Sequence, residues 1–181
     1  MLQHTFCHIH GIGEKTERRL WESGITHWDK WREPLGVPLS QRSRMETPKI
    51  FEHSLEALEK GDPTFFSKRL ASGDTWRLFS EFRSSTAYID IETTGLGDEA
   101  DITTIAMYDG TNIYSYVNGR NLEDFLDDVQ RYSVLVSYNG KSFDVPFIER
   151  FFHTSLPQAQ IDLRFVLAKL GIKGGLKGCE R

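Results

Sequence analysis

The spacing of hydrophobic residues changes near residue 85 and divides the chain into two differently patterned parts. Before that point, apolar side chains recur at helical spacing, as in Ile25, Trp28 and Trp31. Apolar residues three or four apart are typical of the buried face of a helix. Prolines and little periodicity over residues 32–48 indicate a linker, and helical periodicity returns over 49–83. We therefore predict a small all-α N-terminal region with an irregular stretch inside it.

After residue 85 the pattern is that of short strands alternating with helices. β-branched and aromatic residues dominate four predicted strands, at residues 87–92, 101–110, 111–117 and 133–138. Helices are predicted over 121–132 and 145–152, and a short edge strand over 160–163 leads into a further helix. This order predicts an α/β fold whose mixed sheet combines an antiparallel hairpin with parallel crossovers.

Composition and charge exclude several classes of protein. The 181 residues carry a net charge of −4, which is unlike a basic, DNA-coating protein. No run approaches the ~20 apolar residues of a membrane helix, and the first residues lack the pattern of a signal peptide. Two cysteines cannot form a disulfide framework or a four-cysteine zinc site. We expect a soluble, cytoplasmic protein without a membrane partner.

The first predicted strand carries two acidic residues on one face. Asp90 and Glu92 flank Ile91, and alternate residues of a strand point the same way. Adjacent like charges repel each other unless a cation lies between them, and carboxylate oxygens suit Mg²⁺ or Mn²⁺. The alternative is a solvated strand end at which one acid caps the next turn.

A third acid, Asp144, follows another strand. The segment YNGKSFD (138–144) connects the strand over 133–138 to the helix over 145–152, and such junctions usually carry the site of an α/β sheet. The alternative is an N-cap, for which aspartate is a common residue. Two acids on one strand and a third at the end of another favour a metal site.

The N-terminal region contains a candidate phosphate contact. Gly11-Ile12-Gly13 precedes a helix whose free amides would bind a phosphate, and Lys15 would add a positive charge. The alternative is a glycine turn between small elements.

Two motifs carry a family resemblance. AYIDIETTGL (87–96) resembles the first motif of the DEDD, or DnaQ-like, 3′–5′ exonucleases, and YNGKSFDVPFI (138–148) resembles their second. The segment GIGxxTExxLWxxGI (11–25) before them makes the arrangement similar to the YprB-type ribonuclease-H-like family. The resemblance implies a ribonuclease-H-like mixed sheet in an exonuclease domain over 85–181. A helix-hairpin-helix-like segment (1–33) and a linker with helices (34–84) would precede it.

The resemblance also implies roles for individual residues. Asp90, Glu92 and Asp144 would be catalytic and would hold two Mg²⁺ or Mn²⁺ ions, which hydrolyse a phosphodiester bond at a 3′ end of DNA or RNA. The remaining motif residues would contact the nucleic acid: Thr93, Thr94, Leu96, Asn139 and Phe143.

The third motif of that family has no counterpart here. It is a Tyr or His followed by a fourth aspartate on the last helix, whereas the acids after Asp144 are Glu149, Asp162 and Glu180. Asp162 resembles a family aspartate on the preceding strand and not the fourth ligand. We expect a chain that is truncated at its last helix and has weak or no turnover. The rival interpretation is a non-catalytic nucleic-acid-binding module with a degenerate nuclease fold.

Overall fold

The computed structural model describes residues 1–32, 36–97, 99–172 and 175–179. The chain divides into two compact units, Met1–Glu81 and Phe82–Arg181, and each is described by itself. All four tryptophans belong to the first unit and all six tyrosines to the second. Tryptophan fluorescence, excited at wavelengths that tyrosine does not absorb, therefore reports on the first unit alone.

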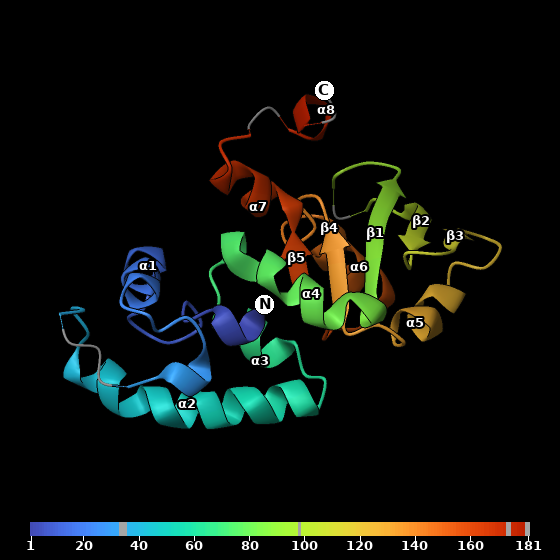
Figure 1. The fold of residues 1–181 in the computed structure, drawn as a ribbon. Helices are drawn as coiled ribbons and strands as arrows, with labels where there is room; N and C mark the ends of the chain where they lie inside the picture. The colour runs from blue at the N-terminus through green and yellow to red at the C-terminus, as the bar shows by residue number, and fades with distance from the viewer. Residues whose placement is uncertain (33–35, 98, 173–174, 180–181) are drawn as a thin grey trace. The chain divides into compact units, whose positions relative to one another are not determined.

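Within the described residues of the first unit every regular element is a helix, as the sequence predicts. Its elements are η1 (Leu2–His4), α1 (Glu14–Glu22), η2 (Trp28–Lys30), α2 (Gln41–Glu59), α3 (Thr64–Ser67), η3 (Ser72–Leu78) and the start of α4 (Phe79–Phe82), where η denotes a 3₁₀ helix (Figure 1). The helix α2 begins inside the stretch that the sequence assigned to a linker. Ser40 caps it by accepting a hydrogen bond from the Ser43 amide at 3.0 Å. Pro48 lies within this helix, so the prediction of irregular structure is wrong for residues 41–48, whereas residues 36–40 are irregular; residues 33–35 lie outside the described residues.

A buried ion pair connects α1 to η3. The Glu17 side chain is 1% exposed and accepts hydrogen bonds from the Thr5 hydroxyl at 2.7 Å, the Phe6 amide at 2.6 Å and Arg77 at 2.8 Å. Asp74 lies on the other side of the Arg77 guanidinium, at 3.3 Å. Because these partners satisfy the buried carboxylate, removing Arg77 would leave an uncompensated charge and cost several kcal/mol.

His8 is buried in the aromatic centre of the same unit. Its ring centroid lies 5.3 Å from that of Trp28 and 5.7 Å from that of Phe66, and its Nε2 lies 3.1 Å from the Ser54 hydroxyl. Within the described residues, His8 Nδ1 has no hydrogen-bond partner. Burial, together with the charges of Arg69 and Arg77, lowers the pKa of His8 to about 3.

This histidine makes the first unit sensitive to acid. In the unfolded chain His8 takes up a proton below about pH 6.5, whereas the folded unit excludes that proton down to about pH 3. The free energy of unfolding should therefore decrease as the pH is lowered through this window, by about 2 kcal/mol between pH 7 and pH 5. Urea unfolding followed by tryptophan fluorescence measures this loss.

The matched variants are His8→Phe, which fills the same aromatic space, and His53→Gln, on the exposed side of α2. His8→Phe should abolish most of the pH dependence, and His53→Gln should retain it. An equal loss of stability in wild type and His8→Phe would contradict this explanation.

The second unit is an α/β domain around a five-stranded sheet. Its strands are β1 (Thr86–Thr93), β2 (Ile102–Tyr108), β3 (Ile113–Val117), β4 (Val134–Ser137) and β5 (Ala159–Asp162), in the order β3-β2-β1-β4-β5. The pairs β1–β2 and β2–β3 are antiparallel, and β1–β4 and β4–β5 are parallel. The mixed sheet predicted from the sequence is confirmed.

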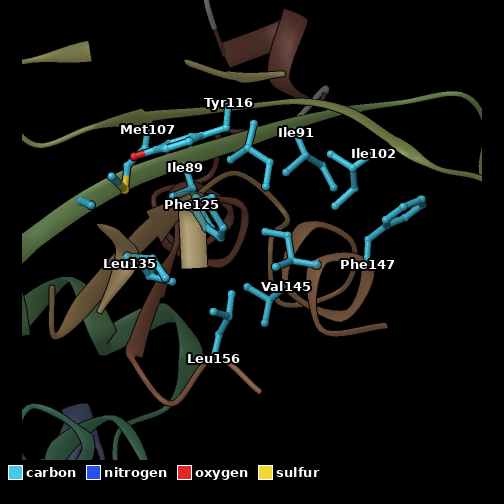
Figure 2. Close-up of a cluster of buried hydrophobic side chains, with 14 of the residues drawn as sticks. Ile89, Ile91, Ile102, Met107, Tyr116, Phe125, Leu135, Val145, Phe147 and Leu156 are labelled. Atoms are coloured by element: carbon cyan, nitrogen blue, oxygen red, sulfur yellow. The ribbon is translucent and has the colours of Figure 1, made fainter. Parts of the chain in front are cut away.

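Helices complete the domain. They are η4 (Arg83–Ser85), α5 (Asp124–Val129), α6 (Asp144–Phe152), α7 (Leu163–Lys169) and α8 (Leu176–Cys179). Side chains from α5 and α6 pack against one face of the sheet and form the core with Ile89, Ile91 and Met107 (Figure 2). Because strand residues alternate between faces, the even-numbered residues of β1 turn away from this core.

Candidate active site

Asp90 and Glu92 project from the face of β1 opposite the core. Both are exposed, and they alternate with Ile89 and Ile91, which are 4% and 6% exposed. The strand ends at an irregularity between Glu92 and Thr93. The predicted common face for the two carboxylates follows directly from this alternation.

Asp144 lies against the same strand. It is the first residue of α6 and only 3% exposed, and the backbone amide of Ile91 lies close enough to its carboxyl group to lower the pKa of Asp144. That amide belongs to the residue between Asp90 and Glu92. Segments more than fifty positions apart in sequence thus meet at the end of β1.

The charge of Asp144 is costly in this position. Burial is the main reason why the pKa of Asp144 is raised to about 6, and the negative charge of the neighbouring Asp90 carboxylate adds to the rise. The backbone amides of Asp144 and Ile91 act in the opposite direction and offset only part of it. A cation beside these acids would offset both effects. The carboxylate oxygens are the hard donors that Mg²⁺ and Mn²⁺ take, usually together with water. Among the described residues, however, no three His, Cys, Asp or Glu side chains gather into a ready-made metal group.

The turn after β1 carries the next residues of the first motif. The Thr93 hydroxyl donates to the Gly95 carbonyl at 2.8 Å, and the Thr94 hydroxyl accepts from the Asp101 amide at 2.9 Å. Leu96 is 83% exposed at this turn. The two threonines therefore shape the loop, and Leu96 is a large apolar side chain that the loop presents to solvent.

The second motif forms the connection from β4 to α6. Asn139 adopts a left-handed conformation with φ of 66°, and its side-chain oxygen accepts a hydrogen bond from Arg164 at 2.6 Å. Phe143 is half-buried, with its ring centroid 5.7 Å from that of Phe147, so it packs on the core. Asn139 and Phe143 thus give the motif its shape around Asp144.

The glycine turn of the first unit has a cavity beside it. Gly11, with φ of 80°, and Gly13, which precedes α1, line a cavity of about 460 Å³ together with Cys7, Arg69 and Asp74. Lys15 is exposed in the first turn of α1. Before the turn, the described residues form only the three-residue 3₁₀ helix η1, so the helix-hairpin-helix resemblance is not confirmed.

Two residues near Asp144 were not selected from the sequence as site residues. Asp162 is wholly buried and bonds to the loop before Asp144. Gly140 is so closely packed that an added Cβ would lie 1.9 Å from the Ser137 hydroxyl oxygen. The one sequence signal for Asp162 was an aspartate at the end of an apolar strand. Gly140 had no such signal, because the close approach of the Ser137 side chain to it arises only in the folded structure.

Within the described ranges, no helix is both long enough and apolar enough to cross a bilayer.

Comparisons with known proteins place the second unit in a family. The family model of the RNase_H superfamily matches residues 87–181. The search of curated proteins gave no match. Among solved structures, the family B DNA polymerase from the hyperthermophilic archaeon Pyrobaculum calidifontis aligns with a TM-score of 0.35 and 16% identity, over 49% of this chain and 18% of the polymerase chain.

So short and distant an alignment transfers no property of the polymerase to this chain. The family model, by contrast, runs from β1 to the last residue and covers just over half of the sequence. The protein therefore belongs to the RNase H superfamily.

Proposed function

We propose that the second unit is a metal-dependent nuclease of the DEDD, YprB-like type that hydrolyses DNA or RNA from a 3′ end. The superfamily, whose members are usually nucleases, supports nucleic-acid hydrolysis. The observation that carries the finer proposal is the position of the buried Asp144 at the first turn of α6, where the Asp90 carboxylate and the Ile91 amide both act on its carboxyl group.

Asp90, Glu92 and Asp144 would hold two Mg²⁺ or Mn²⁺ ions. When bound, such ions lower the pKa of water and neutralise charge on the phosphate and the leaving oxygen. The chain's own contribution is a fixed set of carboxylates and a partly desolvated Asp144, which strengthens the attraction for a cation.

The loop after β1 would bind the 3′ end of the nucleic acid. Leu96 offers exposed apolar surface against a terminal base, and the turn closed by Thr93 and Thr94 offers backbone groups to the sugar. Gly11, Gly13 and Lys15 would contact phosphate in the first unit. Glu14, which is exposed in the first turn of α1, opposes this second contact, because its negative charge weakens the positive end of the helix.

The rate of the 181-residue chain is expected to be low. Glu149, Asp162 and Glu180 are the acids that follow Asp144, and none follows a Tyr or His in the spacing of the third motif. A site with three carboxylates in place of four holds metal less tightly and orients the attacking water less well.

Degradation of 5′-labelled single-stranded DNA and RNA in Mn²⁺ tests this function. We expect a ladder that shortens from the 3′ end, that EDTA abolishes, and that Asp90→Asn reduces by about 10²–10³-fold. Binding of the oligonucleotides without cleavage at any Mn²⁺ concentration would refute the nuclease and favour the binding module.

A further inference from the structure

The carboxylate of Asp162 accepts three backbone hydrogen bonds at the end of β5. Its Oδ1 accepts from the Asn139 amide at 2.8 Å and from the Arg164 amide at 3.0 Å, and its Oδ2 accepts from the Lys141 amide at 3.2 Å. Asp162 is 0% exposed. Because both oxygens already have partners inside the protein, this acid is poorly placed to bind a metal ion.

Two of the three amides belong to the loop that leads to Asp144. Asn139 is one of only two described non-glycine residues with a positive φ, a conformation that costs about 1 kcal/mol or more without supporting contacts. Asp162 supplies one such contact at the Asn139 amide, and Arg164 supplies another at the Asn139 side chain, at 2.6 Å.

The loop is in turn bonded to the first turn of α6. The Phe143 amide donates to the Asn139 carbonyl at 3.1 Å, and the Val145 amide donates to the Gly140 carbonyl at 2.9 Å. A shift of Asn139 or Gly140 would therefore be transmitted to Asp144, which lies between Phe143 and Val145.

We propose that Asp162 is a positioning residue, which holds the loop of residues 138–144 so that the Asp144 carboxylate stays at the Ile91 amide beside Asp90. This inference rests on the proposed function, in which Asp144 binds the metal ion. Asp162 acts through the loop and touches neither metal nor substrate.

The geometry requires a carboxylate at this position. An asparagine would keep one acceptor oxygen but turn an NH₂ group toward a backbone N–H, where two donors would face each other. A serine would keep a cap for the Arg164 amide but is too short to serve the loop amides as well.

The test compares Asp162→Asn and Asp162→Ser with a matched control, in the full chain. Asp109→Asn is the control, because Asp109 accepts the Thr111 and Asn112 amides at 2.8 and 2.7 Å in the β2–β3 turn. That turn lies at the opposite end of β1 from Glu92, since β1 and β2 are antiparallel. Asp162→Ser, which retains the helix cap, keeps the test open if Asp162→Asn does not fold.

Three measurements are made on each variant: amide hydrogen exchange over residues 138–144, Mn²⁺ affinity by calorimetry, and kcat and KM on a 5′-labelled oligonucleotide. We expect the Asp162 variants to exchange at least about tenfold faster in the loop and to bind Mn²⁺ about 10–100-fold more weakly. Their kcat should fall while KM changes less than about twofold, and excess Mn²⁺ should restore part of kcat. Asp109→Asn should accelerate exchange only in its own turn.

Several outcomes would overturn the proposal. Unchanged exchange in the loop would show that Asp162 does not hold it, and faster exchange with unchanged Mn²⁺ affinity would leave Asp162 a purely structural residue. A wild-type chain that binds no Mn²⁺ refutes the proposed function instead. The exchange measurement needs no metal, so it still decides whether Asp162 anchors the loop.

Discussion

Asp144→Asn should stabilise the metal-free protein by about 1–2 kcal/mol while abolishing its stabilisation by Mn²⁺. The folded pKa of Asp144 is raised to about 6 from its usual value near 4, so folding disfavours its charge at neutral pH. The free energy of unfolding therefore falls as pH rises through about 4 to 6, by up to about 3 kcal/mol. The amide variant removes this penalty but also loses part of the favourable interaction of the carboxylate with the backbone amides of Asp144 and Ile91, so the net gain is smaller.

The same variant removes a proposed metal ligand. At a Mn²⁺ concentration 100 times its Kd, wild type should gain about 2.7 kcal/mol and Asp144→Asn essentially none. Metal-dependent cleavage should fall about 10³-fold, which corresponds to about 4 kcal/mol of transition-state stabilisation.

Urea unfolding followed by amide hydrogen exchange in the strands of the sheet measures both effects in the second unit. Asp127→Asn, an exposed acid of α5, is the matched control and should leave both stability and Mn²⁺ response within about 0.5 kcal/mol of wild type. If Asp144→Asn were less stable than wild type without metal, the carboxylate would be a structural N-cap and not a strained functional group.

The architecture of the second unit was predictable because its local patterns agree with its tertiary contacts. The period of two in β1 places Ile89 and Ile91 in the core and Asp90 and Glu92 outside it, which is also what the sheet requires. The Asp109-Gly110 pair forms the β2–β3 turn, where Gly110 has φ of 94°. Strand boundaries agree with the predicted ones to within one or two residues for β1, β2 and β4.

The helix α2 was missed at its start because tertiary contacts override local preference there. An interior proline costs about 3 kcal/mol in an isolated helix, so Pro48 argued for a break. In the folded unit the Ser40 cap and the burial of Phe51, Ser54 and Ala57 along one face of α2 compensate for this cost. Neither the strength of the cap nor the identity of the covering side chains can be read from the sequence.

The surroundings of Asp144 illustrate a different limit. The sequence identified the residue, and the two motifs predicted that it lies near Asp90. Its closeness to the Ile91 amide and the three amides held by Asp162 depend on how β1, β4 and β5 lie side by side. Such contacts between distant segments have no local signature, so the positions of the site residues were predictable and the partners that hold them were not.

Gly140→Ala should be the most destabilising small substitution in the second unit. A Cβ on Gly140 would lie 1.9 Å from the Ser137 hydroxyl oxygen and 2.6 Å from the Ser137 Cβ, far inside van der Waals contact. Ser137 is a buried residue of β4, bonded into the sheet, so the loop must move and not the strand. Overpacking usually costs about 1–3 kcal/mol, and we expect at least about 3 kcal/mol here.

Urea unfolding followed by amide hydrogen exchange in the strands of the sheet measures this loss, and a double-mutant cycle assigns its cause. Ser137→Gly removes both clashing atoms, so Gly140→Ala/Ser137→Gly should be more stable than Gly140→Ala alone, although Ser137→Gly by itself costs about 1 kcal/mol in a strand. Gly97→Ala, which adds a Cβ with nothing within 4 Å among the described residues, should change stability by less than about 0.5 kcal/mol. Equal stabilities for Gly140→Ala and Gly97→Ala would mean that the loop before Asp144 has room to adjust. Close packing of this loop would then not explain how Asp144 is held in place.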